Sequence, residues 1–364
     1  MIGLFLVACS PRKASTPAHN DLSLLIGTYT DGSSKGIYTY SFDQETGRST
    51  LLDSVAVSNP SYLTPSADGK FVYAVSEQND AGAALNAFAF DRTTGHLTLL
   101  NRRSTCGGDP CYVSTNGKEA LTANYSGGSM SVFPIEKDGS LGEIDTLFEG
   151  SVGGPDVARQ ATPHVHCATF SPDGGYIFAT DFSSDSILRF VVHPTHCTPH
   201  RSSAATPVDS ATGPRHLTFS PNGKFAYLIG ELSGNITAFS YHDGVLRSIQ
   251  TIAADTLRAR GSADIHLSPD GRYLYASNRL QGDGIAIFEV NPATGMLAKA
   301  GYQSTGIHPR HFNITPNGKY LLVACRDSHV VQVFSRDADT GMLTDTHQDI
   351  TLDKPVCIQF VGRP

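Results

Sequence analysis

The chain has 364 residues with a formal net charge of −7, and 40% of them are hydrophobic while only 17% are charged. This charge balance gives no support to nucleic-acid binding, which favours basic patches. No long charge run, low-complexity tract or linker divides the sequence, so we expect one large folded domain over residues 21–364.

The N-terminal segment Met1–Cys9 is a short apolar run that ends in a small residue and a cysteine. Leu6–Cys9 resembles the lipobox of a bacterial lipoprotein signal, in which cleavage before Cys9 leaves a lipidated N-terminus and a polar tether. The run is too short to span a membrane, and it departs from a typical signal because no Lys or Arg precedes it. We expect residues 1–20 to be a signal and tether and the protein to be lipid-anchored in the cell envelope. The alternative is an N-terminal extension of a cytoplasmic enzyme.

A β-hairpin pattern recurs along the rest of the chain and is clearest in residues 213–231. Leu217–Ser220 alternates apolar and polar residues, Pro221–Gly223 supplies a tight turn, and Phe225–Ile229 is a second strand pattern. The turn returns at steps of 48, 57, 49, 48 and 47 residues, counted between its acidic or amide residues: Asp68, Asn116, Asp173, Asn222, Asp270 and Asn317. A second turn marker, Thr-Gly or Asp-Gly, lies between successive hairpins.

One period of this repeat holds about four strands, which is what a blade of a β-propeller requires. Six hairpins are visible, and the chain ends complete a seventh blade. Pro355–Val361 resembles a first strand without its hairpin, whereas Leu24–Thr30 and Gly36–Phe42 look like later strands of a blade that lacks its first. Pairing of the terminal strands would close the ring and leave no open sheet edge. We therefore predict an all-β, seven-bladed propeller of four-stranded antiparallel blades; the absence of Trp argues against the WD40 type.

Six cysteines lie beyond the lipobox, and their spacing does not settle the compartment. Cys106 and Cys111 could close a small disulfide loop in an oxidising compartment, or remain free. Three others lie inside strand patterns and are expected to be small buried apolar residues: Cys167, Cys325 and Cys357. No Cys-x-x-Cys pair is present, so zinc ligation is not favoured.

The strand ends opposite each hairpin turn are predicted to meet at one mouth of the ring. Seven positions before each turn Asp or Asn, the first strands begin at Ser61, Asp109, His166, Arg215, Ala263 and Arg310. Nine positions after it, the second strands end at Glu77, Tyr125, Phe182, Glu231, Arg279 and Arg326. The rest of each strand is apolar or small, so the ionisable groups concentrate at this mouth.

The predicted mouth combines four Arg, two Glu, a His and an Asp, a composition that suits a site for a small anion. Arginine clamps a carboxylate or phosphate with bidentate hydrogen bonds, and Glu or His moves protons. Ion pairs between blades would use the same residue types, so that interpretation remains open. His164 and His166 would point to the same side of an extended strand, but they could also be a half-buried, hydrogen-bonded pair. No third ligand lies at a diagnostic spacing, and no metal is predicted.

Several motifs set in these hairpins resemble those of the seven-bladed propeller lactonase family, over essentially all of residues 22–361. They are Gly27–Thr30, Pro163–His166, Gly213–His216, Gly230-Glu231, Ser277–Arg279 and Pro309-Arg310. The family includes bacterial 6-phosphogluconolactonases and fungal carboxymuconate cyclases. By similarity to the cyclase branch, the catalytic set falls on residues that the hairpin register already places together: His166, Arg215, Glu231 and Arg279.

The resemblance implies hydrolysis of a sugar-acid δ-lactone, 6-phosphogluconolactone before others, without a cofactor. Glu231 or His166 would deprotonate the attacking water, while Arg215 and Arg279 would stabilise the oxyanion. Four further residues are expected to bind the small anionic lactone: His164, Glu77, Arg310 and Arg326. Of these, Arg310 or Arg326 would hold a distal phosphate or carboxylate. Two alternatives stay open. One is a cycloisomerase that forms or opens a muconolactone without water, and the other is a lipid-anchored propeller that binds a ligand or partner and catalyses nothing.

Overall fold

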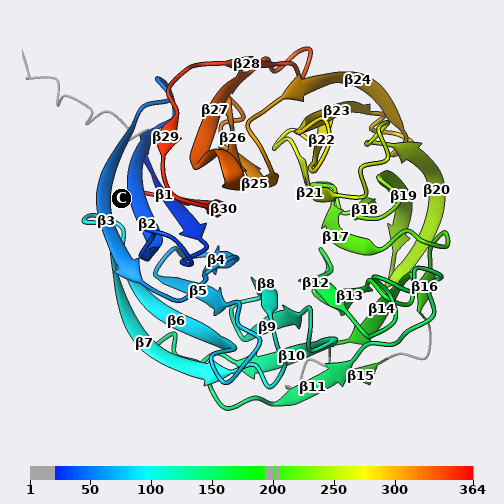
Figure 1. Ribbon diagram of the computed structural model, residues 1–364, viewed down its shortest axis with the longest axis horizontal. Coiled ribbons are helices and arrows are strands. Elements are labelled where there is room, and N and C mark those ends of the chain that lie inside the picture. Colours follow the sequence, from blue (N-terminus) through cyan, green and yellow to red (C-terminus); the bar gives the residue numbers. More distant parts are fainter. Residues whose placement is uncertain (1–20, 193–199, 202–204, 364) are drawn as a thin grey trace, which may run out of the picture.

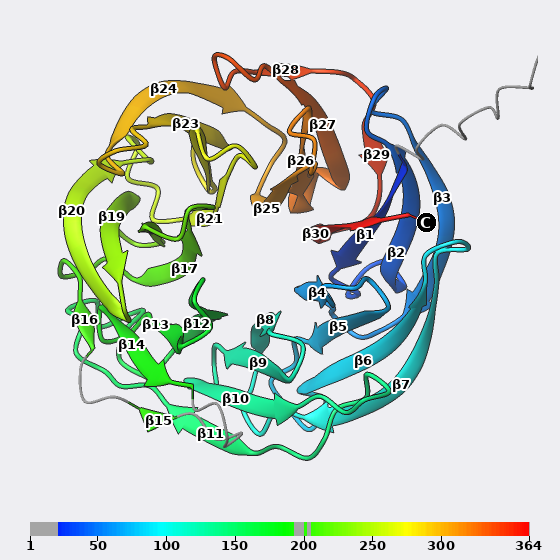
Figure 2. The same cartoon turned by 180° about the vertical axis from the view of Figure 1, so that it is seen from behind.

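Seven antiparallel sheets form a ring in the computed structural model, which describes residues 21–192, 200–201 and 205–363 (Figure 1). Each sheet runs from an innermost strand near the centre of the ring to an outermost strand at its rim, as the view from behind also shows (Figure 2). The predicted seven-bladed propeller is confirmed. The predicted signal and tether, with Cys9, lie outside the described residues, and so does Cys197. No helix in the described part of the chain is long and apolar enough to cross a membrane.

The strands of each blade follow one another from the centre of the ring outward. Blade 1 contains β30 (Pro355–Gly362), β1 (Asp21–Thr28), β2 (Gly36–Asp43) and β3 (Ser49–Ala56). Blades 2 and 3 contain β4 (Leu63–Pro65), β5 (Phe71–Ser76), β6 (Ala84–Asp91) and β7 (His96–Ser104), then β8 (Pro110–Thr115), β9 (Glu119–Asn124), β10 (Ser129–Pro134) and β11 (Thr146–Glu149). Blade 4 contains β12 (Val165–Phe170), β13 (Tyr176–Asp181) and β14 (Ser186–Val191), with an outer strand in two pieces, β15 (His200–Arg201) and β16 (Thr206–Pro207).

The remaining blades repeat this order. Blades 5 and 6 contain β17 (Pro214–Phe219), β18 (Phe225–Gly230), β19 (Asn235–His242) and β20 (Val245–Ala253), then β21 (Ser262–Leu267), β22 (Tyr273–Asn278), β23 (Gly284–Val290) and β24 (Leu297–Ser304). Blade 7 contains β25 (Pro309–Ile314), β26 (Tyr320–Cys325) and β27 (Val330–Arg336), with an outer strand in two pieces, β28 (Leu343–Asp345) and β29 (Ile350–Thr351). A short 3-10 helix, η1 (Arg326–Ser328), follows β26.

The ring is closed by the two ends of the described chain. β30 pairs antiparallel with β1, from Leu22 opposite Gly362 to Gly27 opposite Cys357. The C-terminal strand thereby supplies the innermost strand of the blade that begins the chain, as the sequence predicted. Because β30 pairs with the inner side of β1, that side of β1 is not left as an open edge for association with another chain.

Neighbouring blades are joined through glycines of the second turn marker. Gly341 of blade 7 has a φ of +72°, and a Cβ there would lie 2.3 Å from the Tyr273 ring of blade 6. The Gly341 carbonyl also accepts a 2.8 Å hydrogen bond from the Tyr275 hydroxyl. Gly295 repeats both contacts one blade earlier, with Phe225 beside it and a 3.0 Å bond from Tyr227. The turn thus needs glycine both for its backbone and for the aromatic ring packed on it.

A one-residue β-bulge interrupts the innermost strand in six of the blades, always at the same end. In β17, for example, Pro214 pairs with Gly230 and His216 with Ile229, so Arg215 is left without a partner in the ladder. The extra residue breaks the strict alternation of sides, which allows two successive side chains to face the centre of the ring. The bulges therefore direct additional side chains toward the centre at this end of the ring.

Candidate active site

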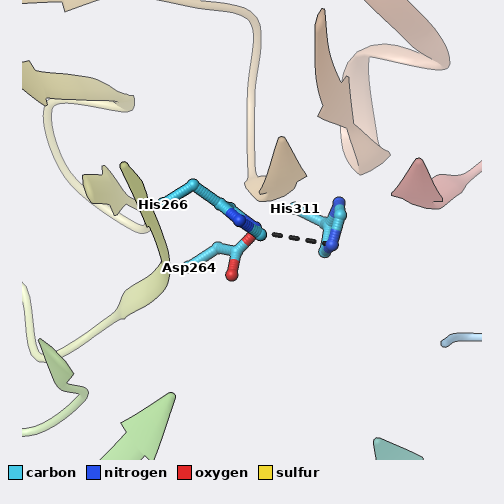
Figure 3. A group of neighbouring side chains, drawn as sticks. All are labelled: Asp264, His266 and His311. Carbon is cyan, nitrogen blue, oxygen red and sulfur yellow. Dashed lines mark hydrogen bonds and ion pairs between the residues drawn. The ribbon is translucent and has the colours of Figure 1, made fainter. Parts of the chain in front are cut away.

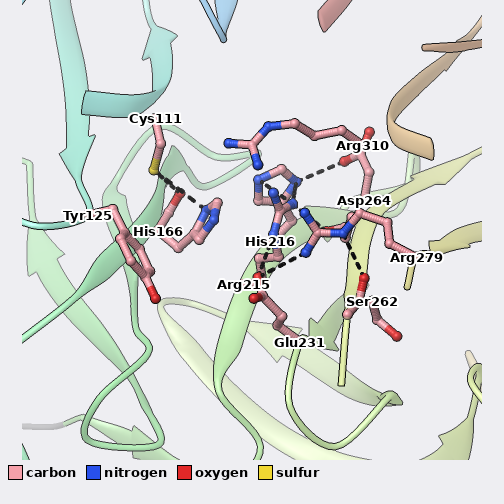
Figure 4. Close-up of polar contacts among 12 residues, drawn as sticks. Cys111, Tyr125, His166, Arg215, His216, Glu231, Ser262, Asp264, Arg279 and Arg310 are labelled. Carbon is pink, nitrogen blue, oxygen red and sulfur yellow. Dashed lines mark hydrogen bonds and ion pairs between the residues drawn. The ribbon is translucent and has the colours of Figure 1, made fainter. Parts of the chain in front are cut away.

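Bulge residues and strand-end residues from several blades converge at one end of the ring. His166 and Arg215 occupy the bulges of β12 and β17, whereas Glu231 and Arg279 directly follow β18 and β22. Figure 4 shows their side chains directed toward a common centre from separate strands. The four residues predicted to be catalytic are therefore brought together, and each is no more than 7% exposed.

Glu231 is the electrostatic centre of this group because three guanidinium groups surround its carboxylate. Its Oε2 lies 3.0 Å from Arg215 Nε and 3.3 Å from Arg279 Nη2, and its Oε1 accepts a 2.8 Å hydrogen bond from Arg159. Burial alone would raise the pKa of Glu231, but the three arginines outweigh it and lower the pKa to about 2. Glu231 is thus a carboxylate throughout the physiological pH range.

The guanidinium of Arg215 is held on three sides. Its Nε donates to Glu231, and its Nη1 donates to the Ala263 carbonyl at 2.6 Å. The same Nη1 lies against the His216 ring, 3.2 Å from Nε2 and 3.5 Å from Nδ1. Among the described residues, none forms a hydrogen bond with Nη2. Arg279 is fixed similarly. Its Nε donates a 2.7 Å hydrogen bond to the Gly261 carbonyl, and its Nη1 lies 3.3 Å from His308 Nε2. Both arginines are preorganised donors beside one carboxylate.

His166 faces the same group from blade 4. Its ring centroid lies 5.2 Å from that of His216, and its Nδ1 lies 3.6 Å from Cys111 Sγ. Burial, followed by the positive charge of Arg215, lowers the pKa of His166 well below its ordinary value. The imidazole is therefore neutral at neutral pH and retains a lone pair for accepting a proton.

The opposite side of the mouth is built from blades 1, 2 and 7. Arg310 lies 3.5 Å from the Glu77 carboxylate, with its guanidinium carbon 5.4 Å from the centre of the Tyr29 ring, and the Tyr29 hydroxyl donates to Glu77 at 3.0 Å. Arg326 is bound to Asp327, with atoms 2.6 and 2.9 Å apart. A hollow of about 520 Å³ opens here, lined by Tyr29, Asp31, Asn59, Glu77, Asp109, Arg326, Asp327 and Lys354. Two of the predicted substrate-binding residues, Glu77 and Arg326, thus border a cavity.

His164 differs from its neighbour His166. Its ring stacks on Tyr125, with centroids 4.2 Å apart and an interplanar angle of 6°, and its Nδ1 lies 2.8 Å from the Tyr125 carbonyl oxygen. Both histidines contact Tyr125, but His164 is a half-buried, hydrogen-bonded residue that packs beside the site. Phe182 is fully buried, and the guanidinium carbon of Arg159 lies 5.3 Å from the centre of its ring.

The layer beneath the mouth contains a buried carboxylate, Asp264, with His266 and His311 close enough to suggest a metal site (Figure 3). Hydrogen bonding argues against that role. Asp264 Oδ1 accepts from His216 Nδ1 at 2.8 Å and from the Ile265 backbone at 3.0 Å, while Oδ2 accepts from His266 Nε2 at 3.0 Å and from the Phe312 backbone at 3.1 Å. His311 Nδ1 accepts the Ile358 N–H, so its own proton is on Nε2, which faces the carboxylate. The cluster surrounds an anion with N–H donors and offers a cation few lone pairs.

Blade 3 answers the open question about its two cysteines and differs from the other blades in its register. Cys106 and Cys111 are both free thiols, the first exposed and the second buried, where its sulfur faces His166. Asp109 does not occupy the bulge, because the hairpin of blade 3 is shorter than the others and the bulge falls on Cys111 instead. Asp109 lies just before the strand, where its carbonyl accepts the Tyr125 N–H and its carboxylate accepts from Ser126.

Sequence reasoning also missed two residues of the mouth. Tyr29 follows β1 as Glu77 follows β5, and extending the hairpin register to the N-terminal blade would have found it. Arg159 comes from the long connection between β11 and β12, whose sequence has no repeat or strand pattern. This connection is tied across the mouth by Asp156, which pairs with Arg260, and by the bond from Arg159 to Glu231. No sequence signal predicted that contact.

Comparison with known proteins gives this arrangement a family. The model of the family "Lactonase, 7-bladed beta-propeller" matches residues 23–360. The chain belongs to this family. The 6-phosphogluconolactonase of Formosa agariphila is 35% identical over 348 residues, which cover 93% of this chain and 99% of that protein. The resemblance of the hairpin motifs to the seven-bladed lactonase family is thereby confirmed.

Solved structures agree with this membership of the seven-bladed lactonase family. One from Bacteroides uniformis is 70% identical and has a TM-score of 0.93, covering 94% of this chain and 100% of its own. The periplasmic gluconolactonase PpgL of Pseudomonas aeruginosa is 34% identical, with a TM-score of 0.89 over 94% of this chain and 100% of its own.

Proposed function

We propose that the chain is a lactone hydrolase that opens a sugar-acid δ-lactone at the mouth formed by His166, Arg215, Glu231 and Arg279, with 6-phosphogluconolactone as the first substrate to test. The observation that supports this most is the convergence of the buried His166 with Arg215 and Arg279, whose guanidinium groups are held by hydrogen bonds. That pairing supplies a proton acceptor and oxyanion donors within one buried site. Membership of the lactonase family and the names of relatives support the same reaction class.

In the proposed reaction, a water molecule attacks the lactone carbonyl carbon as His166 accepts its proton. The carbonyl oxygen becomes an oxyanion, which the N–H groups of Arg215 and Arg279 stabilise by about 3 to 4 kcal/mol for each well-placed donor. The intermediate then collapses, the bond to the ring oxygen breaks, and the leaving alkoxide takes up the proton from His166. The products are a hydroxyl group and an open-chain carboxylic acid, which releases its proton to solvent to become the carboxylate, and no cofactor is consumed.

The choice between His166 and Glu231 as the base follows from their hydrogen bonds. The carboxylate oxygens of Glu231 are occupied by three guanidinium groups, and a pKa of about 2 makes this group a poor proton acceptor. The His166 ring is less occupied, since Cys111 is the one side chain within hydrogen-bond distance of its ring nitrogens among the described residues. Glu231 instead orients the arginines and balances their charge.

Hydrolysis in water enriched in ¹⁸O tests this proposal and distinguishes it from the cycloisomerase alternative. We expect enzyme-dependent formation of an acid that carries one solvent oxygen in its carboxylate, faster than the spontaneous decay of the lactone. Glucono-δ-lactone, assayed beside 6-phosphogluconolactone, shows whether the distal phosphate contributes. Conversion without solvent oxygen would favour a cycloisomerase, and decay of every lactone at its spontaneous rate would reject catalysis.

A further inference from the structure

The bulge register of the innermost strands extends to blade 2, although β4 is short. In this blade the Asn59 carbonyl accepts the Glu77 N–H at 3.0 Å, and the Tyr62 carbonyl accepts the Val75 N–H at 3.1 Å. Ser61 lies between these two bonds, and its own N–H turns back to the Asn59 carbonyl at 2.7 Å instead of joining the ladder. Ser61 is therefore the extra residue of a bulge.

The same backbone pattern surrounds Arg215 in blade 5. There the Gly213 carbonyl accepts the Glu231 N–H at 2.9 Å, and the bulge follows. Ser61 therefore has in blade 2 the position of Arg215. The next side chain, Tyr62, points to the centre of the ring, where it lies 4.3, 6.0 and 5.3 Å from aromatic rings of blades 3, 5 and 7. We expect Ser61 to face the mouth one layer above Tyr62, because a bulge lets two successive side chains share one side.

The Ser61 hydroxyl is buried without a partner. The residue is 2% exposed, yet its Oγ forms no hydrogen bond with any of the described residues. By comparison, the buried Ser262 hydroxyl of β21 donates to Asn278 Oδ1 at 2.7 Å. A buried hydroxyl without a partner costs free energy, and a bound ligand that pairs with it would recover that cost. Low exposure does not separate Ser61 from the site, because Arg215 and His166 are only 1% and 5% exposed.

Blade 2 lies across the ring from the groups that would hold the lactone carbonyl. Arg215 and Arg279 belong to blades 5 and 6, which face blade 2 over the centre of the ring (Figure 1). A δ-lactone whose carbonyl oxygen meets these arginines therefore directs its far carbon atoms toward blade 2. In a sugar-acid lactone those atoms carry hydroxyl groups, which donate and accept hydrogen bonds as a serine hydroxyl does.

We propose that Ser61 is a substrate-binding residue whose Oγ forms a hydrogen bond with a ring hydroxyl of the sugar-acid lactone, so that it favours hydroxylated lactones over lactones without ring hydroxyls. This inference rests on the proposed lactonase function for the orientation of the ligand. Binding of the open-chain acid tests the contact without turnover.

Kinetics of Ser61→Ala and Ser23→Ala test this contact. Ser23 is the matched control: it is 0% exposed, its Oγ also lacks a partner among the described residues, and it lies near the start of β1, at the end of the blade away from the mouth. With glucono-δ-lactone and 6-phosphogluconolactone, which share their ring hydroxyls, we expect Ser61→Ala to lower kcat/KM by about 5- to 15-fold, chiefly through KM. With δ-valerolactone, which has no hydroxyl group, both variants should match wild type.

Calorimetric titration with gluconate gives a readout that does not depend on hydrolysis. Ser61→Ala should raise the Kd of gluconate by about 5- to 15-fold, whereas Ser23→Ala should leave it unchanged. Neither substitution should lower the midpoint of urea unfolding of the free protein, because each removes a buried hydroxyl that has no partner among the described residues.

A Ser61→Ala variant with wild-type kinetic constants would overturn the inference while the lactonase function stands. Equal losses of Ser61→Ala with hydroxylated lactones and with δ-valerolactone would overturn it too. So would a lowered unfolding midpoint in Ser61→Ala but not in Ser23→Ala, which would show that the hydroxyl already has a partner in the protein. A wild type that binds gluconate more tightly than Ser61→Ala but hydrolyses no lactone would reject the proposed function and keep this contact, and a wild type that does neither would reject both.

Discussion

His166 and Glu231 are separated in role by what surrounds them. Both are buried, yet Glu231 is kept ionised by three arginines while His166 is kept neutral by burial and by the positive charge of Arg215. Because the surroundings lower the pKa of both groups, each group stays in one protonation state near neutral pH. The site is thus set for proton transfer through His166 without any change of charge on Glu231.

The rate should therefore be nearly independent of pH near neutrality. After subtraction of the spontaneous rate, we expect kcat/KM to be flat from about pH 5.5 to about pH 8, because neither His166 nor Glu231 titrates there. Replacing His166 by Asn should lower kcat by about two to four powers of ten. An acid limb with a midpoint near 6.5, the ordinary pKa of histidine, would contradict the neutral, buried base.

The buried histidines should also make stability depend on acid. Burial lowers the pKa of His216 and of His308 to about 3, with help from neighbouring arginines, and that of His311 to about 4. In the unfolded chain these histidines take up protons as the pH falls through about 6.5, but in the folded chain they do not. The free energy of unfolding is therefore constant above about pH 6.5 and decreases as the pH falls from there to the pKa of the histidine in the folded protein. Each histidine should cost about 1.4 kcal/mol per pH unit in this window.

Urea unfolding between pH 6 and pH 5 measures this dependence. In the His311→Asn variant, the free energy of unfolding should change less steeply with pH than in the wild type. The difference in slope should correspond to about one proton. A variant with the wild-type slope would show that His311 titrates equally in both states.

The residue identities of the site were largely predictable, but their contacts were not. Counting from the hairpin turns was enough to bring His166, Arg215, Glu231 and Arg279 together, because antiparallel pairing fixes how far each strand end lies from its turn. Arg159 could not be found in this way, since it reaches Glu231 from an irregular connection. The hydrogen bonds of His216 and Asp264 depend on side-chain directions that the bulges alter, and no strand pattern reports them.

At the scale of the strand, the repeat is readable because each blade reuses the same turns. Gly69, Gly174, Gly223, Gly271 and Gly318 all have φ between +66 and +72°, as tight hairpin turns need. In blade 3, counting back from the turn does not lead to the bulge, because the first strand of this blade is separated from its turn by fewer residues. The bulge therefore lies at Cys111. A single sequence shows where turns recur, but a strand shortened within one blade changes the register without a visible marker.

Gly27 of β1 gives a test of how closely strands of adjacent blades approach. A Cβ at this position would lie 2.1 Å from the Pro60 carbonyl oxygen, a backbone atom that cannot move aside easily. We expect Gly27→Ala to lower the free energy of unfolding by about 1 to 3 kcal/mol. Gly362→Ala is the matched control, because Gly362 belongs to the same sheet and a Cβ there would meet nothing within 4 Å. Equal stabilities of the two variants would argue against the close approach.

At the scale of the whole molecule, ring closure determines where a lipid anchor would lie. β1 begins at Asp21 and ends beside Tyr29, which belongs to the mouth, so residue 21 is at the end of the blade away from the mouth. We propose that Cys9 is lipidated and that the mouth therefore opens away from the membrane, toward diffusing substrate.

Fractionation of cells that produce the full chain tests this anchor. We expect the wild type in the membrane fraction and labelled by a fatty-acid probe, and Cys9→Ser in the soluble fraction with unchanged kcat, because residue 9 lies far along the chain from the site. An unlabelled wild type in the soluble fraction would favour the cytoplasmic alternative.

In the proposed reaction, the guanidinium groups at this mouth drive the opening of a lactone. The most direct measurement is the rate of 6-phosphogluconolactone and glucono-δ-lactone hydrolysis above the spontaneous rate, for wild type, Arg215→Ala and Arg272→Ala. Arg272 is exposed in the turn before β22, where it contacts Asp339 rather than the site. We predict that wild type accelerates at least one lactone, that Arg215→Ala loses about 100- to 1,000-fold in kcat, and that Arg272→Ala matches wild type. Wild-type rates equal to spontaneous decay for both lactones, or full activity in Arg215→Ala, would contradict the account.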